Sequence, residues 1–339
     1  MEEKIKIYIP ESVNNILLKD MERFEFYKKD GSLNKNEFYN TLIVNYYEQF
    51  EESQSNLFSH IREAIKEKAE VSHNAINEIA ADILQYVDVR TYQLDKEKYD
   101  VAIAMKPTKK SMDDIDYIQD YLLRDSTLSN YFRNMFASYA QLPQDKRETI
   151  IFRQNFELIR EAIEKKRKIY FTTINYDSPH IVSPYAIANS KEELFNYLIC
   201  QYKDIPYSFR MSRIRKAKIL NESIDSMEEM TSIFDKMAKY GPQFSYEVKK
   251  AHQPIVVRLT ERGQKQFKAM YLHRPMPCKI ENDVYYFDCS RSQAFQYFSR
   301  LGSNALVLEP AELIEDLHRF YSFAERKYRK IGKNDSTNE

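Results

Sequence analysis

Arginine and tyrosine residues gather between positions 185 and 216 of this sequence. Arg210 and Arg213 stand three positions apart, and a guanidinium group is planar, always charged and able to bind phosphate through two parallel hydrogen bonds. Tyrosine rings in the same stretch offer faces on which unpaired bases can stack, a combination that suits single-stranded nucleic acid. The residues expected to contact it are Tyr185, Tyr197, Tyr207, Arg210, Arg213, Arg215 and Lys216. A purely structural role is the alternative, with Tyr197 filling a core and Arg210 pairing with an acidic residue.

A second group of charged residues lies at the N-terminus. Charged or polar side chains alternate there with isoleucines, so an extended strand would expose Lys4, Lys6 and Tyr8 on one face and bury the isoleucines on the other. Pro10 suits the first turn of a following helix, and a second helix is expected after Asn34, where Glu37 completes a capping-box-like pair. This order of elements is typical of a ribbon-helix-helix half.

One strand and two helices cannot bury their apolar stripe alone. We therefore predict a homodimer in which two copies pair their strands antiparallel, forming a ribbon of the size that the DNA major groove admits. The alternative is that residues 4–10 form an edge strand capping a larger sheet.

Catalytic and cofactor chemistry is not indicated. The six histidines are scattered, no carboxylates have metal-site spacing, and none of the five glycines lies in a phosphate-cradling motif. The three cysteines include no close pair, so we expect buried free thiols and neither a disulfide framework nor a zinc site. The sequence predicts a protein that is not an enzyme, without cofactor or metal.

Composition limits where a nucleic-acid surface could lie. The 339 residues contain 51 basic and 51 acidic side chains, so such a surface must be a local patch. No stretch approaches the roughly 20 apolar residues of a membrane span, and the N-terminus lacks a signal-peptide pattern. We expect a cytoplasmic protein with no membrane contact.

Helical periodicity dominates the first half of the chain and short strands the next part. Apolar spacing predicts helices from about residue 55 to residue 165, interrupted by a strand at 101–105. Short strands are then expected at 169–174, 181–187, 195–202, 207–211 and 214–220, and five strands in about fifty residues suggest a small barrel.

This strand region resembles the WYL domain. The family's Trp-Tyr-Leu triplet appears as Asn196-Tyr197-Leu198, preceded by Ser183-Pro184-Tyr185 and followed by the segment Phe209-Arg210-Met211-Ser212-Arg213-Ile214. Asn196 replaces the usual tryptophan, and Tyr207 stands where an arginine often opens the last motif. The resemblance implies an Sm-like five-stranded β-barrel that binds ligands, including nucleic acids and nucleotides.

The resemblance extends to the C-terminal part of the chain, which is similar to the α/β module called WCX. The predicted fold is α+β, with a ribbon-helix-helix module at 1–52, a helical region at 53–165, the WYL barrel at 166–222, a linker helix at 223–252, a WCX-like α/β domain at 253–330 and a disordered tail at 331–339.

This module order resembles two groups of bacterial proteins. One is the WYL accessory proteins of type VI-D CRISPR systems, which bind single-stranded RNA and modulate an RNA-targeting effector. The other is ribbon-helix-helix transcription regulators, which bind duplex DNA and carry a sensory WYL domain. The first group is our leading interpretation, because Lys4, Lys6 and Tyr8 include no side chain that reads base edges bidentately.

Overall fold

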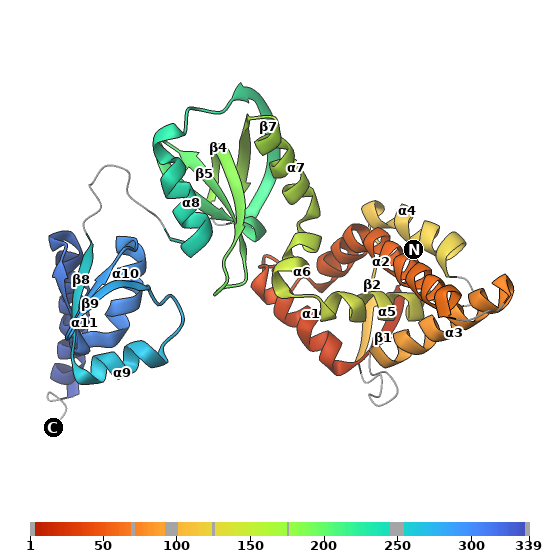
Figure 1. Ribbon diagram of the computed structural model, residues 1–339, viewed down its shortest axis with the longest axis horizontal. Helices are drawn as coiled ribbons and strands as arrows, with labels where there is room; N and C mark the ends of the chain where they lie inside the picture. The colour runs from red at the N-terminus through yellow and green to blue at the C-terminus, as the bar shows by residue number, and fades with distance from the viewer. Residues whose placement is uncertain are drawn as a thin grey trace. The chain divides into compact units, whose positions relative to one another are not determined.

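The computed structural model describes residues 4–68, 72–91, 101–123, 126–174, 176–244 and 254–335. The chain folds into two compact units (Figure 1): unit 1 comprises Met1–Leu158 and Met211–Arg215, and unit 2 comprises Ile159–Arg210 and Lys216–Glu339. Both units combine helices with antiparallel strands, in agreement with the predicted α+β class. Within the described ranges, no helix has both the length and the apolar character needed to cross a bilayer.

Unit 1 is mainly helical. Pro10 stands at the N-cap position, directly before the first helical turn in which the sequence analysis places it. The side chains of Asn34 and Glu37 pair at the start of the second helix, as the sequence predicts. Its elements are β1 (Ile5–Ile9), α1 (Glu11–Arg23), α2 (Lys35–Lys68), α3 (His73–Thr91), β2 (Val101–Met105), α4 (Lys109–Tyr117), the π-helical turn η1 (Ile118–Leu122), α5 (Leu128–Gln141), α6 (Gln144–Ile151) and the first part of α7 (Arg153–Glu164).

The ribbon expected from two copies of the chain forms within one chain. β1 pairs antiparallel with β2, placing Ile7 opposite Ile103 and Tyr8 opposite Ala102. Ile7 and Ile9 are fully buried, and α5 lies against β1. The strand therefore buries its isoleucines without a second copy, which removes the reason for the predicted pairing between chains. Homodimerisation itself stays a prediction.

Helix α2 is longer than the sequence suggests and crosses the predicted boundary at residue 52. Two of its asparagines hold the chain where it leaves β2: Asn36 accepts a hydrogen bond from the Lys106 amide at 2.7 Å, and Asn40 donates to the Lys106 carbonyl at 3.0 Å. These bonds tie the ribbon to helix α2 within unit 1, which includes Met1–Leu158. A stacked pair, Tyr39 on Phe136 at 5.9 Å, lies in the core beside them.

The first part of unit 2 is a five-stranded antiparallel sheet in the order β6-β5-β4-β3-β7. The strands lie close to their predicted positions: β3 (Arg167–Thr173), β4 (Tyr176–Asn189), β5 (Asn196–Tyr202), β6 (Ile205–Arg210) and β7 (Ile214–Ser223). β6 and β7 stand at opposite ends of this order, and no pairing among the described residues joins them. The strands were thus predicted correctly, but the closed barrel is not found.

A helix and a smaller sheet complete unit 2. The short turn η3 (Glu228–Met230) leads into α8 (Thr231–Tyr240), which lies within the predicted linker helix at 223–252 and ends at Gly241. The C-terminal part has a four-stranded sheet, in the order β11-β8-β10-β9, and helices that pack on its core. Its elements are β8 (Ile255–Leu259), α9 (Glu261–Ala269), β9 (Pro277–Glu281), β10 (Val284–Phe287), α10 (Arg291–Phe298), the turn η4 (Ser299–Asn304), β11 (Ala305–Glu309) and α11 (Ala311–Asp335).

The last helix of the structure reaches into the predicted tail at 331–339. Helix α11 continues through residues 331–335, while residues 336–339 lie outside the described part of the chain. Leu313 and Leu317 are buried in the C-terminal core and fix the start of this helix.

Candidate nucleic-acid interface

The outer face of the β1–β2 ribbon carries the predicted N-terminal residues. Lys4 and Lys6 are exposed, and Tyr8 is 41% exposed, with the Lys6 ammonium 5.3 Å from the centre of its ring. Opposite Lys6 and Tyr8 the second strand contributes only Ala104 and Ala102. The result is a basic face with small side chains on its second strand, which can contact phosphate but offers few groups able to hydrogen-bond to a base edge.

Strand register separates the residues predicted on the five-stranded sheet. Arg210 pairs with Tyr197, whereas Tyr207 pairs with Cys200. Side chains an odd number of positions apart on a strand point to opposite faces, so Tyr207 lies on the other face from Arg210 and Tyr197. The predicted arginine and tyrosine set is therefore not one surface.

Helix α8 covers part of the face that carries Tyr197. Tyr185 stacks on Phe234 of this helix, with ring centres 4.7 Å apart, and donates a hydrogen bond to Asp235 at 3.0 Å. Burial, together with the neighbouring Asp235 carboxylate, raises the pKa of the Tyr185 hydroxyl. Tyr185 thus helps to attach α8 to the sheet.

A polar corner lies where β5 begins. Tyr197 is buried, and its hydroxyl donates to Glu193, whose other oxygen is 3.1 Å from the His273 ring. The Arg210 guanidinium lies 3.2 Å from the centre of the Phe195 ring. The burial of Tyr197 matches the structural alternative for that residue, whereas the contact of Arg210 with an aromatic ring differs from the acidic partner that this alternative expects.

The opposite face ends in an aromatic cluster, consisting of Phe171, His180, Tyr202, Tyr207 and Phe209. Their ring centres are 4.7 to 5.8 Å apart, and Tyr207 is 38% exposed. Burial, and then the charge of Lys203, lowers the pKa of His180. The sequence analysis included Tyr207 but missed His180, which no local motif marks.

Lys203 stands at the tip of the hairpin beside this aromatic cluster. Its ammonium is 5.1 Å from the centre of the Tyr202 ring. Lys203 and Asp204 connect β5 to β6 with φ values of 50° and 61°, the positive φ pair that a type I′ turn requires. Each of these non-glycine residues costs about 1 kcal/mol in that conformation. Asn-Gly or Asp-Gly would mark this turn in a sequence, so the Lys-Asp pair gave no signal.

Two of the predicted arginines are held within unit 1. Arg213 pairs with Glu25 at 2.7 Å, and Arg215 donates to the carbonyls of Ser212 and Ile214 at 2.7 and 2.9 Å. Desolvation lowers the pKa of Arg215. Lys216, on β7, is exposed and has a positive φ of 51°. Arg213 and Arg215 therefore have partners in unit 1, and Lys216 remains a surface cation.

Lysine and aromatic side chains are in contact at several exposed points of the molecule. Besides Lys203 on Tyr202 and Lys6 on Tyr8, Lys218 lies 4.6 Å from the centre of the Tyr170 ring. In such a pair a base can stack on the aromatic ring in place of the lysine, and the lysine ammonium can then bind a phosphate. Among the described residues, no three carboxylate, imidazole or thiol side chains gather as a metal site would require.

Comparison with known proteins gives a structural likeness and no sequence family. No family profile matches the sequence, and no curated protein matches it. A solved structure described as "Crystal structure of a CRISPR Cas-related protein" superposes with a TM-score of 0.64 and 20% identity, covering 97% of this chain and 95% of that one. The Proteasome accessory factor B/C (PafBC) of Arthrobacter aurescens aligns with a TM-score of 0.25 and 13% identity, over 96% of this chain and 50% of that one. The chain thus shares its overall fold with a CRISPR Cas-related protein.

Proposed function

We propose that this protein is a non-catalytic accessory protein of a CRISPR system that binds single-stranded RNA and modulates an RNA-guided, RNA-targeting effector. The observation that carries the proposal is the superposition on a CRISPR Cas-related protein, which covers nearly the full length of both chains. WYL, ribbon-helix-helix and WCX relationships, cytoplasmic location and a homodimeric state belong to the same proposal.

The aromatic cluster and Lys203 provide the chemistry for RNA in this proposal. Tyr207 offers an exposed ring on which an unpaired base can stack, and Lys203 can bind the adjoining phosphate from the tip of the same hairpin. The tight turn between β5 and β6 places the lysine beside Tyr202 of this cluster. Contacts of this kind do not depend on base identity, so we expect little sequence preference.

The first experiment compares the affinities of the full-length protein for single-stranded RNA, single-stranded DNA and duplex DNA at one stated salt concentration. Preference for single-stranded RNA supports the proposal. Preference for duplex DNA contradicts it and favours the alternative below.

Two variants locate the site. Lys203→Gln should weaken RNA binding several-fold, and Tyr207→Ala should cost about 1–3 kcal/mol of binding free energy because a base can no longer stack on the ring. Lys279→Gln is a matched control, because the Lys279 ammonium also lies 5.1 Å from a tyrosine ring, that of Tyr286, but on the C-terminal sheet. Thermal denaturation confirms that each variant folds. Equal losses of affinity in the Lys203 and Lys279 variants would refute the assignment to the aromatic cluster.

The alternative function is a DNA-binding transcription regulator, and the ribbon is the observation that favours it. A two-stranded antiparallel ribbon with Lys4, Lys6 and Tyr8 on its open face has the dimensions of a major-groove element. Lys4→Gln/Lys6→Gln should abolish duplex binding and spare RNA binding. Sedimentation velocity on the full chain tests the proposed homodimer independently.

A further inference from the structure

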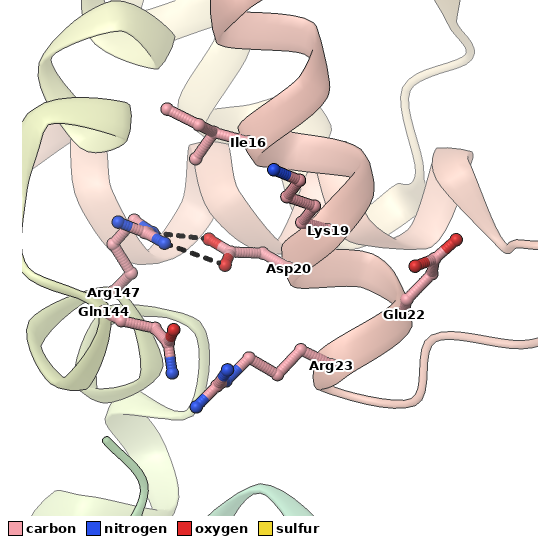
Figure 2. Close-up of a pocket in the computed structure, with 7 residues that line it drawn as sticks. All are labelled: Ile16, Lys19, Asp20, Glu22, Arg23, Gln144 and Arg147. Carbon is pink, nitrogen blue, oxygen red and sulfur yellow. Dashed lines mark hydrogen bonds and ion pairs between the residues drawn. The ribbon is translucent and has the colours of Figure 1, made fainter. Parts of the chain in front are cut away.

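A hollow of about 420 Å³ opens on unit 1 between α1 and the start of α6 (Figure 2). None of its lining residues belongs to the predicted nucleic-acid sites. The lining comes from two helices: Ile16, Lys19, Asp20, Glu22 and Arg23 from α1, and Gln144 and Arg147 from α6. Its volume falls within the range of about 300–1,000 Å³ that small-ligand sites occupy.

The carboxylate at the base of the hollow, that of Asp20, forms an ion pair with Arg147. Asp20 is 1% exposed and accepts hydrogen bonds from Arg147 at 2.6 and 3.1 Å and from the Tyr139 hydroxyl at 2.9 Å. Burial, and then the Asp20 charge, raises the pKa of Tyr139, so the phenol keeps the proton that it donates. Because Asp20 is paired in this way, it does not repel an anion entering the hollow.

Lys19 and Arg23 bring positive charge to the opening. They lie four positions apart on α1 and hence on the same side of the helix, with Lys19 on one side of Asp20 and Arg23 on the other in Figure 2. Like charges at this spacing destabilise a helix by a few tenths of a kcal/mol, an arrangement that a bound anion would relieve. Arg23 extends toward the amide of Gln144, at the positively polarised N-terminus of α6. The Glu22 side chain points away from Arg23 and from Gln144.

The lining also indicates what kind of anion fits. Guanidinium, ammonium and amide groups all donate hydrogen bonds to phosphate oxygens. The lining contains one apolar side chain, Ile16, and no aromatic ring, so it offers no face on which a base could stack.

We propose that this hollow binds a phosphate group through Lys19, Arg23 and Gln144. Where the protein holds an RNA strand, the bound group is a backbone phosphodiester, and this second part rests on the proposed function. A free phosphate or a nucleoside monophosphate presents the same chemistry, and the experiment below separates these sources.

The test uses the full chain and the double variant Lys19→Gln/Arg23→Gln. Lys28→Gln/Lys29→Gln is the control, because it removes two exposed positive charges from unit 1 outside the hollow. The probes are inorganic phosphate, adenosine monophosphate and a short single-stranded RNA without a terminal phosphate. Thermal denaturation checks that both variants fold, which we expect because Lys19 is exposed and Arg23 is only partly buried.

We expect the Lys19→Gln/Arg23→Gln variant, but not the control variant, to bind RNA at least about tenfold more weakly, because it removes two charge-assisted contacts. Its salt dependence, as the slope of log affinity against log salt, should become shallower by about 0.7 for each phosphate that the variant no longer binds. Weaker phosphate and monophosphate binding with unchanged RNA affinity would keep the phosphate site but assign it to a free ligand.

Two results would overturn the proposal: equal effects in the control variant, or no change with any probe. If the unmodified protein binds no RNA, the proposed function fails, and the two small probes alone decide whether the hollow is a phosphate site.

Discussion

The buried pair of Asp20 and Arg147 allows a quantitative prediction about stability. Asp20→Ala should lower the free energy of unfolding of unit 1 by about 3–5 kcal/mol, the usual cost of removing one partner of a buried ion pair. Asp20 accepts three hydrogen bonds, and bonds to charged groups contribute about 1.5–3 kcal/mol each. Their simple sum exceeds our figure, because the alanine variant also avoids the cost of burying the Asp20 carboxylate.

The effect is measured by urea unfolding, followed by circular dichroism and by tyrosine fluorescence, since the chain has 26 tyrosines and no tryptophan. Asp20→Leu/Arg147→Met is the informative companion, because it removes both charges together and should recover most of the stability. A decrease below about 1 kcal/mol in Asp20→Ala, or a double variant as unstable as the single one, would refute the reasoning that burial makes this pair important.

Three further predictions concern unit 2. The pKa of His180 is lowered from 6.5 in the folded protein, so the unfolded chain binds a proton more readily, and the free energy of unfolding should fall as the pH drops through 6.5. His180→Phe should remove this dependence of stability on pH, measured by denaturation between about pH 7.5 and 5. Gly263→Ala should cost about 1–3 kcal/mol, measured by thermal denaturation, because the added Cβ would stand 2.2 Å from the Asn304 carbonyl oxygen. Iodoacetamide should modify one thiol of the native protein quickly, the exposed Cys278, since burial raises the pKa of both other cysteines; mass spectrometry showing two fast modifications would contradict this.

Local features of the fold could be predicted from the sequence because neighbouring residues determine them. The alternation in residues 4–10 correctly predicted which side of β1 is buried, and the short apolar run at 101–105 is a strand. Ser290 caps α10 by accepting a hydrogen bond from the Gln293 amide at 3.1 Å, and serine is a residue type favoured at this position. Each of these features involves residues that lie only a few positions apart in the sequence.

Pairing between distant segments could not be predicted in the same way. No residue pattern near β1 or β2 indicates that these two strands pair with each other. The polar residues after Phe50 interrupt the apolar pattern, so the sequence did not show that α2 continues as one helix. The separation of Tyr207 from Arg210, by contrast, was available in principle, since an odd spacing along one strand places side chains on opposite faces. The hollow between α1 and α6 depends on residues more than a hundred positions apart, and no motif joins them.

The path of the chain between its two units constrains how the protein folds during synthesis. Residues 211–215 belong to unit 1, although the chain has already built four strands of the unit 2 sheet before reaching them. Buried Glu148 accepts a hydrogen bond from the Ser212 amide at 3.1 Å, and Glu25 pairs with Arg213.

Unit 1 therefore cannot complete its hydrogen bonds and ion pairs until the ribosome has passed residue 215, and pairings so distant in sequence slow folding. A fragment ending at residue 158 would lack these donors. It would expose surface that the complete protein covers, so fragments for solution studies should retain the whole chain through the crossing.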